Sequence, residues 1–262
     1  MDLGLKGKVA LLTGSSRGLG FATARTLAEE GVRIAINGRD QQQLKNAKNK
    51  LSKFGPEVIS LPGDVAQKDT GEKLVKETVS AYGGLDLLFI NSGGPPPLPF
   101  EEITEEAWQT AIDLVFMSHV RLIRAALPHL RQSKAPSVLT VTSVSIKQPI
   151  PNLVLSNSVR AATAGLTKTL ALELGADHIR FNSILPSWTK TERVKQLLQD
   201  RADRKGTTIE AEIKAQNSAS PLGRMGTPQE FANAAAFLLS PAASYLTGVM
   251  LTVDGGSFKG TF

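Results

Sequence analysis

The sequence contains no cysteine among its 262 residues. A disulfide framework, a thiolate nucleophile and a zinc site built on cysteine are therefore excluded. Histidine is also scarce, and His119, His129 and His178 stand far apart, without the spacing that metal ligands share. We therefore expect no catalytic metal site.

Long apolar runs are missing as well. No segment approaches the roughly 18 apolar residues of a membrane-spanning helix, and residues 1–8 lack the apolar centre of a secretory signal peptide. The sequence therefore predicts a cytoplasmic protein without a membrane partner.

The chain has an excess of positive charge, with a formal net charge of +6. Its Lys and Arg residues are spread along the expected helices among Asp and Glu rather than massed in one block. This distribution indicates solvated helix faces together with a phosphate-bearing cofactor, and it argues against a nucleic-acid partner.

Short apolar runs alternate with longer amphipathic segments along the whole chain, which is typical of a buried parallel sheet between helices. We predict strands at 9–13, 33–37, 57–61, 85–90, 137–142, 180–184 and 249–253, and helices near 18–30, 41–53, 68–82, 105–130, 153–174 and 228–239. No repeat or linker divides a second domain. The predicted fold class is α/β, a single-domain Rossmann fold over residues 1–262 with a doubly wound parallel sheet of about seven strands.

A glycine-rich turn follows the first predicted strand and leads into the first predicted helix. Gly14 permits the tight turn, Gly18 lets backbone amides approach a pyrophosphate, and Gly20 lets the helix pack closely on the strand. No Gly-Lys-Ser/Thr ending is present, so a nucleoside triphosphate loop is disfavoured. The turn predicts a dinucleotide site.

The end of the second predicted strand favours NADP(H) over NAD. A carboxylate there would accept from the ribose 2′-hydroxyl, but the strand ends with Asn37, and Arg39 follows shortly afterwards. Arg17 lies in the glycine turn, and two guanidinium groups suit a 2′-phosphate because each offers paired donors. Asp40 is the contrary signal, and we interpret it as the N-cap of the second helix.

The glycine spacing resembles the TGxxxGxG loop of the short-chain dehydrogenase/reductase family. Other segments are similar to that family in the right order: Gly63-Asp64-Val65, Asn91-Ser92-Gly93, residues 182–191, and residues 246–256. Ile90 and Ser187 depart from its usual asparagine and glycine. The resemblance implies that the cofactor is bound by Gly14, Ser16, Arg17, Gly18, Leu19, Gly20, Arg39, Asp64, Val65, Asn91, Ser92, Gly93, Arg160, Pro186 and Thr189.

The resemblance also implies a catalytic tetrad of asparagine, serine, tyrosine and lysine, and here the chain departs from its family. Ser143 matches the serine, but Ser156 and Arg160 stand where tyrosine and lysine are expected, and Val115 stands where asparagine is expected. Positions 156 and 160 share one helix face, so Arg160 still offers donors to ribose hydroxyls. We take Ser143, Ser156 and Arg160 as the candidate catalytic residues. The alternatives are that Ser156 and Arg160 lie on a solvated helix face without a role, and that Ser143 is a strand-end hydroxyl that bonds the backbone.

Proton donation is the step that this departure affects. A serine hydroxyl is a far weaker acid than a phenol next to a cation, and loss of a positioned general acid costs about 10² to 10⁴ in rate. Tyr82 and Tyr245 are expected to be packing residues rather than substitutes, and Lys147 is expected to be solvated. The proton must then come from water, Ser143, Ser156 or the substrate.

Two stretches interrupt the strand and helix rhythm. Residues 93–99, rich in glycine and proline, follow the fourth strand and are expected to form a stiff loop beside the cofactor rather than a peptide ligand. Residues 191–219 are polar and weakly helical, and we expect a lid-like insertion there.

These observations predict an atypical NADP(H)-dependent oxidoreductase, similar to 3-oxoacyl carrier-protein reductases, acting on a small carbonyl or alcohol substrate. The alternative is a catalytically silent NADP-binding subunit or sensor. The resemblance further implies a homo-oligomer, a dimer or tetramer, formed through the long helices and the last strand.

Overall fold

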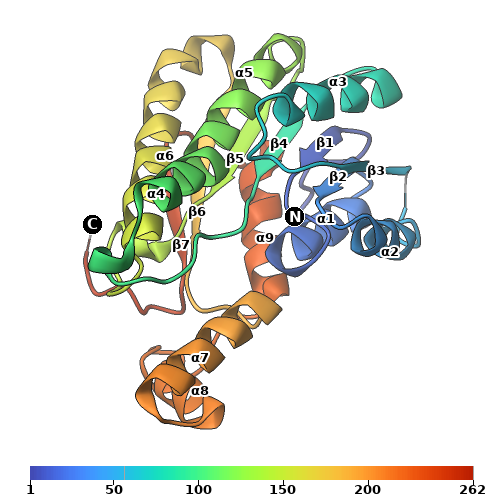
Figure 1. Ribbon diagram of the computed structural model, residues 1–262. Helices are drawn as coiled ribbons and strands as arrows, with labels where there is room; N and C mark the ends of the chain where they lie inside the picture. Colours follow the sequence, from blue (N-terminus) through green and yellow to red (C-terminus); the bar gives the residue numbers. More distant parts are fainter. Residues whose placement is uncertain (56, 262) are drawn as a thin grey trace.

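Seven parallel strands form one sheet in the computed structural model, which describes residues 1–55 and 57–261 (Figure 1). The strands are β1 (Val9–Leu12), β2 (Arg33–Gly38), β3 (Val58–Pro62), β4 (Leu87–Ile90), β5 (Ser137–Val141), β6 (Arg180–Pro186) and β7 (Met250–Val253). Their order is β3-β2-β1-β4-β5-β6-β7, so the direction of winding reverses between β1 and β4. In doubly wound sheets such a reversal opens a ligand crevice at the carboxyl ends of the strands. The predicted fold class is confirmed.

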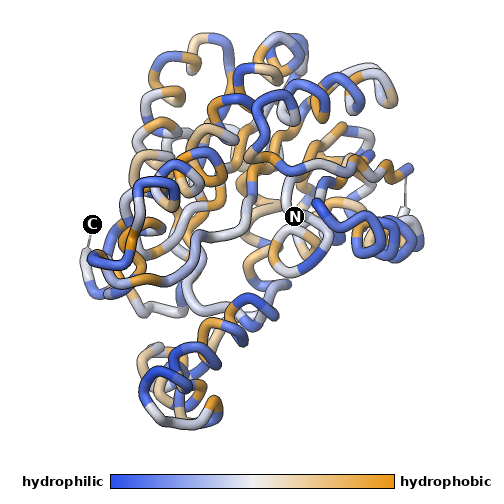
Figure 2. The backbone as a smooth tube through the Cα atoms, in the orientation of Figure 1, coloured by the Kyte–Doolittle hydropathy of each residue, from blue (hydrophilic) through white to orange (hydrophobic). Residues whose placement is uncertain are grey.

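Helices cover both faces of the sheet (Figure 1). One face carries α1 (Gly18–Glu29), α2 (Gln41–Leu51) and α9 (Pro228–Leu239), and the other carries α3 (Thr70–Tyr82), α5 (Ser118–Leu130) and α6 (Val154–Glu173). The strands are buried on both sides because alternate residues point to opposite faces. In β1, Ala10 and Leu12 join the core beneath α1, while Val9 and Leu11 join the core beneath α3. Figure 2 shows that the residues of the strands are mostly hydrophobic, coloured orange.

The predicted helix at 105–130 is interrupted in the structure. It consists of α4 (Glu105–Ile112), a π-helical segment (Asp113–Met117) and α5. Such a π segment shifts the hydrogen bonding by one residue, and the hydrophobic period does not reveal that shift. Val115 lies inside this segment and is fully buried.

The segment at 191–219 is more ordered than its composition suggested. It forms two helices, α7 (Glu192–Lys205) and α8 (Ile209–Ser218), so the expectation of weak helicity was wrong. Thr191 and Thr208 cap them by accepting from the amides of Val194 and Ala211. Both helices extend from the lower end of the domain in Figure 1, beyond the sheet.

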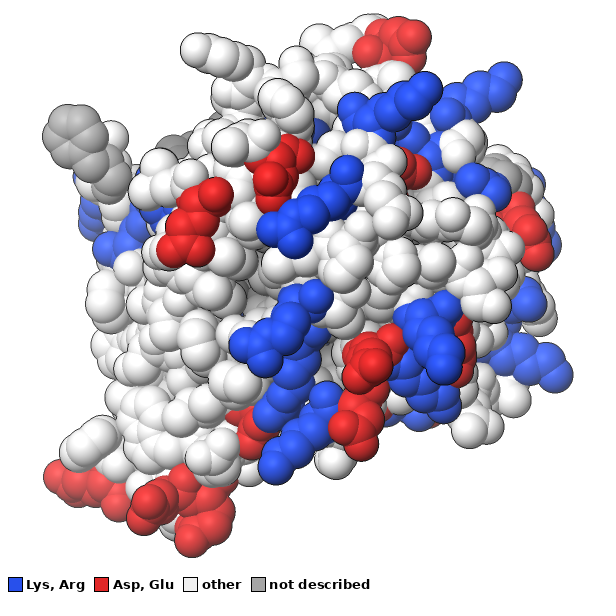
Figure 3. Space-filling view, turned by 90° about the horizontal axis from the view of Figure 1, so that it is seen from above, with Lys and Arg blue, Asp and Glu red and all other residues white. Residues whose placement is uncertain are grey.

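The other predicted elements are present, with ends that differ by up to two residues, as is usual for sequence-based boundaries. The predicted cap is confirmed, because the Asp40 carboxylate accepts from the amide of Gln43 at 2.9 Å. Charged residues of both signs are interspersed on the face shown in Figure 3, without a continuous field of either. Among the described residues no helix is long and apolar enough to cross a membrane.

Candidate active site

The glycine turn between β1 and α1 has the backbone geometry that its sequence predicts. Gly14 and Gly18 have φ of 55° and 58°, in the left-handed region that favours glycine. A Cβ at Gly14 would lie 2.7 Å from the carbonyl oxygen of Asn91, and one at Gly20 would lie 2.3 Å from that of Gly14. Neither position tolerates a side chain, so both glycines serve close backbone packing.

The first turn of α1 is prepared for an anion. Arg17 occupies the N-cap position without a side-chain cap, and no acidic residue lies in the first turn. The unpaired amides there and the positive end of the helix dipole both favour a phosphate group. The start of α1 therefore fits the diphosphate of a dinucleotide.

The loop after β4 is fastened to this turn. Thr13 Oγ1 donates to the carbonyl oxygen of Asn91 at 2.8 Å, and Asn91 Nδ2 donates to that of Gly14 at 3.0 Å. The buried Ser92 Oγ has no hydrogen-bond partner among the described residues. The loops after β1 and β4, where the strand order reverses, are therefore hydrogen-bonded to each other, and Ser92 Oγ remains without a partner among the described residues.

At the end of β2, an exposed Arg39 stands in place of a carboxylate. The side chain of Asn37 is buried and donates to the carbonyl oxygens of Leu61 and Gly63, so it supports the backbone and offers nothing to a ligand. Arg39 is 71% exposed and lies 3.6 Å from Asp64, a surface ion pair of about 0–1 kcal/mol. Its guanidinium therefore remains available for a phosphate.

Ser156 and Arg160 contact each other on α6, as their spacing predicted. Arg160 Nε donates to Ser156 Oγ at 3.2 Å, and Arg160 Nη1 donates to the carbonyl oxygens of Val141 and Thr142 at 3.0 and 3.2 Å. Arg160 thereby ties the first turns of α6 to the end of β5. Burial, and secondarily the charge of Arg193, lower the pKa of Arg160 to about 10, which leaves it charged at neutral pH.

Ser143 follows immediately after that end of β5. Its Oγ accepts from the amide of Ser145 at 3.1 Å, which leaves the hydroxyl proton free to donate. Ser156 Oγ is likewise an acceptor, from Arg160. Arg160 therefore joins the helix that carries Ser156 to the strand end that leads into Ser143, and both hydroxyls keep a proton to donate.

Val115, at the asparagine position of the expected tetrad, has no polar side-chain atom. Val115 is fully buried against Leu155 and Val159, and only its carbonyl oxygen is used, as an acceptor from Thr163. Its side chain is part of the core and has no polar atom with which to order water.

Neither tyrosine replaces the missing phenol. Tyr82 is a packing residue as predicted: its hydroxyl bonds Ile34 and Ile59 in the sheet, and burial raises its pKa to about 12. Tyr245 is fully exposed, so the prediction that it packs was wrong; the chain turns there between α9 and β7. Lys147 lies over the Phe258 ring at 5.3 Å instead of standing free in solvent.

The histidines do not cluster with other metal-ligating side chains in the described part of the chain. Among the described residues no group of three or more His, Cys, Asp or Glu side chains could hold an ion. His119 is fully buried, and burial, together with the charge of Arg160, lowers its pKa to about 3. The imidazole is therefore neutral at physiological pH.

Two cavities border α7. A cavity of about 370 Å³ is lined by Pro97, Ile150, Pro151, Asn152, Leu153, Trp188, Leu197, Arg201, Arg204 and Lys205. A second, of about 730 Å³, is lined by Gly18, Phe21, Ala22, Arg25, Lys190, Thr191, Glu192, Val194, Lys195, Leu198, Ile213, Met225, Thr227, Pro228 and Gln229. The first cavity meets the start of α6, and the second meets the glycine turn.

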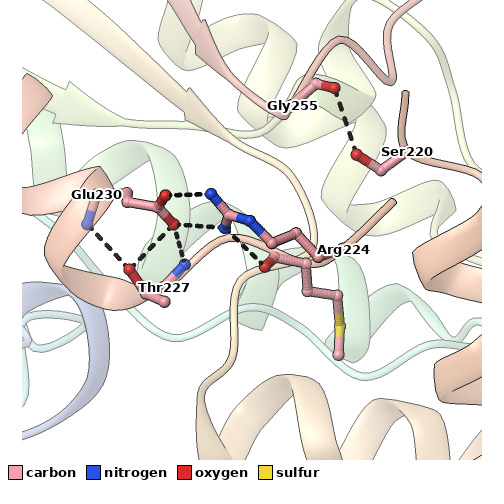
Figure 4. A network of polar contacts seen from close by, with 6 residues as sticks. Ser220, Arg224, Thr227, Glu230 and Gly255 are labelled. Atoms are coloured by element: carbon pink, nitrogen blue, oxygen red, sulfur yellow. Dashed lines mark hydrogen bonds and ion pairs between the residues drawn. The ribbon is translucent and has the colours of Figure 1, made fainter. Parts of the chain in front are cut away.

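The segment that carries α7 and α8 is fixed at its far end. Arg224 donates to both carboxylate oxygens of Glu230, and Glu230 in turn accepts from the amide of Thr227 at the start of α9 (Figure 4). Ser220 Oγ donates to the carbonyl oxygen of Gly255 at 3.3 Å. At its near end, Thr191 lies beside Gly18 of the glycine turn. Both ends of the segment are therefore held next to the site.

The structure does not join every sequence-predicted residue to the site through a contact. Pro186 ends β6, and Oγ1 of the buried Thr189 donates to the carbonyl oxygen of Ser187 at 3.4 Å. Arg193 was missed by the sequence reasoning, although it donates to the carbonyl oxygen of Pro95 at 3.1 Å beside the site. Its contact with Pro95 joins residues 98 positions apart in the chain, so no local spacing could have identified it.

The chain matches known proteins over nearly its whole length. Residues 14–257 match the family described as enoyl-(acyl carrier protein) reductase. Dehydrogenase/reductase SDR family member 4 of Bos taurus is 33% identical over 256 residues, covering 97% of this chain and 88% of that protein. A chloroplastic tropinone reductase homologue of Arabidopsis thaliana is 35% identical over 260 residues, covering 98% and 78%.

A solved structure is similarly close. L-sorbose reductase from Gluconobacter frateurii, complexed with NADPH and L-sorbose, superposes with a TM-score of 0.94 at 33% identity, covering 99% of this chain and 100% of that one. The agreement extends over the complete sheet and both layers of helices.

Proposed function

The chain belongs to the short-chain dehydrogenase/reductase family of oxidoreductases, and we propose that it is an NADP(H)-dependent reductase of small carbonyl compounds with an altered proton-donating site. The observation that carries the proposal is the bonding of Arg160. One guanidinium joins Ser156 to the end of β5, from which Ser143 follows. Two hydroxyls and a fixed cation are thereby held at the carboxyl edge of the sheet.

The residues beside the glycine turn fit NADP(H). The uncapped start of α1 suits the diphosphate, and the exposed Arg17 and Arg39 suit a 2′-phosphate. The Ser92 hydroxyl, which has no partner among the described residues, suits a ribose hydroxyl. When bound, the reduced cofactor supplies a hydride for a carbonyl carbon. The complex of L-sorbose reductase with NADPH supports the same choice.

Ser143 and Ser156 would orient the substrate carbonyl by donating to its oxygen. Arg160 would hold Ser156 in place and stabilise negative charge that develops on that oxygen. A guanidinium does not give up its proton at neutral pH, so the proton would reach the oxygen through a serine hydroxyl from water. We expect slower turnover than with a tyrosine acid, by about 10² to 10⁴.

We propose that α7 and α8 act as a lid over this site. Both ends of the segment are held next to the site, while its middle projects from the domain. We also propose a homo-oligomer, as the family resemblance implies. The fully exposed Tyr245 and the 75% exposed Leu172 are the apolar side chains that such contacts would cover.

The alternative is a catalytically silent NADP-binding subunit or sensor. The buried Val115 and the absence of a phenol beside Ser143 favour it, because a binding role needs the cradle but not the acid.

NADPH oxidation separates the two functions. The purified protein would be tested against a carbonyl panel that includes β-ketoacyl thioesters, with Ser143→Ala as the matched variant. A substrate-dependent rate that this variant lowers by about 10²-fold or more would support the reductase and reject the silent subunit. NADPH binding without turnover on any compound would favour the alternative.

A further inference from the structure

Two guanidinium groups lie close to Gly94, in the loop after β4. A Cβ at Gly94 would stand 3.6 Å from Arg160 Nη2 and 3.9 Å from Arg193 Nη2. Arg160 comes from α6 and is 92% buried, with 8% of its surface exposed, while the exposed Arg193 comes from the first turn of α7. A glycine at position 94 places no side-chain atom next to these two cations.

The charge of this pair is unbalanced. In the part of the chain that the structure describes, neither guanidinium has a carboxylate within ion-pair distance. Nε and Nη1 of Arg160 donate to protein acceptors, but its Nη2 has no acceptor among those residues. Arg193 donates only to the carbonyl oxygen of Pro95. Two neighbouring cations with unused donors attract an anion.

Residues close to the pair in the chain line the smaller cavity, although neither arginine does. Leu197 is one turn from Arg193 on α7, Pro97 is in the same loop as Pro95, and both line the cavity. Of the cations that line the cavity, Lys205 and Arg201 lie 3.3 and 3.9 Å from Glu212, and Arg204 donates from Nε to the carbonyl oxygen of Asp200. Ile150, Leu153 and Trp188 provide an apolar wall.

We propose that Arg160 and Arg193 form a carboxylate site and that the substrate is an oxo acid with an apolar body. This inference rests on the proposed reductase function. Arg160 also contacts Ser156, so a carboxylate at Nη2 lies near the carbonyl that Ser156 orients. In the reduction the carbonyl carbon gains a hydride from the reduced nicotinamide cofactor and the oxygen gains a proton from water, while the carboxylate is unchanged. The product is a hydroxy acid.

The diphosphate of the cofactor carries the same kind of charge, so the experiment must separate it from the substrate. The full-length protein, saturated with NADP⁺ to prevent turnover, would be titrated calorimetrically with benzoylformate and its methyl ester, and with pyruvate and its methyl ester. We expect at least one acid to bind about tenfold or more tightly than its ester, since hydrogen bonds between charged groups contribute on this scale. NADP⁺ affinity would be measured in the same samples.

Arg193→Gln is the main variant, because Arg193 is exposed and its loss leaves the core intact. We expect it to remove most of the preference for the acid and to leave NADP⁺ affinity within about twofold. Arg160→Lys, which keeps the charge but loses the planar fork, should also lower the preference. Lys214→Gln on α8, an exposed charge away from both cavities, is the matched control and should change nothing.

Equal binding of acid and ester in both pairs, or no binding of either acid, would overturn the carboxylate site. So would an Arg193→Gln variant that weakens NADP⁺ and leaves the ratio of acid to ester unchanged, because the cations would then serve the cofactor. NADPH oxidation with the esters alone would keep the reductase and reject the carboxylate site. Tight binding of an acid that is never reduced would keep the carboxylate site and count against the reductase.

Discussion

Two arginines are buried in this protein, and they are used in different ways. Arg180 donates to the carbonyl oxygens of Leu238, Leu239 and Ser240 at 2.7 to 3.0 Å, at the carboxyl end of α9. Arg160 bonds the end of β5 and Ser156 but keeps Nη2 free beside Arg193. Burial lowers the pKa of each to about 10.

The two arginines differ in how many of their guanidinium nitrogens have a hydrogen-bond acceptor. Both terminal nitrogens of Arg180 are occupied by the last carbonyls of a helix, whose partial negative charge replaces a carboxylate. Arg160 has an unused donor and a neighbouring cation, and nothing within the described structure balances either. A buried guanidinium by itself therefore does not indicate function; the two arginines differ in that Arg160 Nη2 has no acceptor among the described residues.

A third arginine completes the comparison. Arg224 at the start of α9 is exposed and paired with Glu230 through two hydrogen bonds (Figure 4). An arginine therefore stabilises each end of α9. At the start, Arg224 binds an exposed carboxylate, and at the carboxyl end Arg180 binds buried backbone carbonyls.

Arg180→Met should give the largest change in stability. Three buried carbonyls would lose their donor, and each unsatisfied acceptor costs about 1–3 kcal/mol, so we expect the free energy of unfolding to fall by roughly 3 kcal/mol or more. Chemical denaturation followed by circular dichroism measures this. A loss no larger than that of Arg160→Met would remove the distinction between the two arginines.

Arg160→Met should affect activity more than stability. The substitution also removes the repulsion from Arg193, so we expect the free energy of unfolding to fall by only about 1–2 kcal/mol. Turnover of an accepted substrate should fall by about 10-fold to 100-fold as the fixed cation is lost. Unchanged turnover in a folded Arg160→Met protein would show that Arg160 is as structural as Arg180.

His119 offers a measurement of the charge on Arg160. Its folded pKa of about 3 lies below the ordinary 6.5, so the unfolded chain binds the extra proton first and stability falls as the pH drops from 6.5 towards 3. His119→Phe should flatten this part of the stability profile, measured by denaturation at a series of pH values. Arg160→Met should raise the folded pKa of His119, so the pH at which the loss of stability ends should rise. The rise should be small, because burial is the larger cause of the lowered pKa.

Glu230→Gln should give the smallest effect, confined to acid. Hydrogen bonds from Arg224 and Thr227 lower the pKa of Glu230 from 4.5 to about 2, so its contribution is complete above pH 4.5 and is lost as the pH falls towards 2. Thermal unfolding at neutral pH should change little, because the pair is exposed. The variant should lose less stability than the wild type between pH 4.5 and 2; an identical acid profile would contradict the expectation.

The conformation of the glycine turn could be predicted from the local sequence. Its glycines were predicted to serve a tight turn and close packing, and the short distances at Gly14 and Gly20 give that prediction its physical reason. The contact between Ser156 and Arg160 was also predictable, because residues four apart on a helix are neighbours. These features depend on residues that are close in the chain.

Other features had no local signal. The π segment around Val115 depends on packing against α6, the order of α7 and α8 was underestimated from polarity, and the exposure of Tyr245 was mistaken for burial. Arg193 drew no attention in the sequence because its neighbour across the site is far away in the chain.

The sequence by itself determined the α/β fold and the position and conformation of the glycine turn, because periodicity and glycine geometry are local properties. The tertiary structure decided which donors are used and which remain free. Whether the guanidinium of Arg160 is balanced depends on carbonyls of β5 and on Arg193 of α7, and only folding brings those groups within reach of one another.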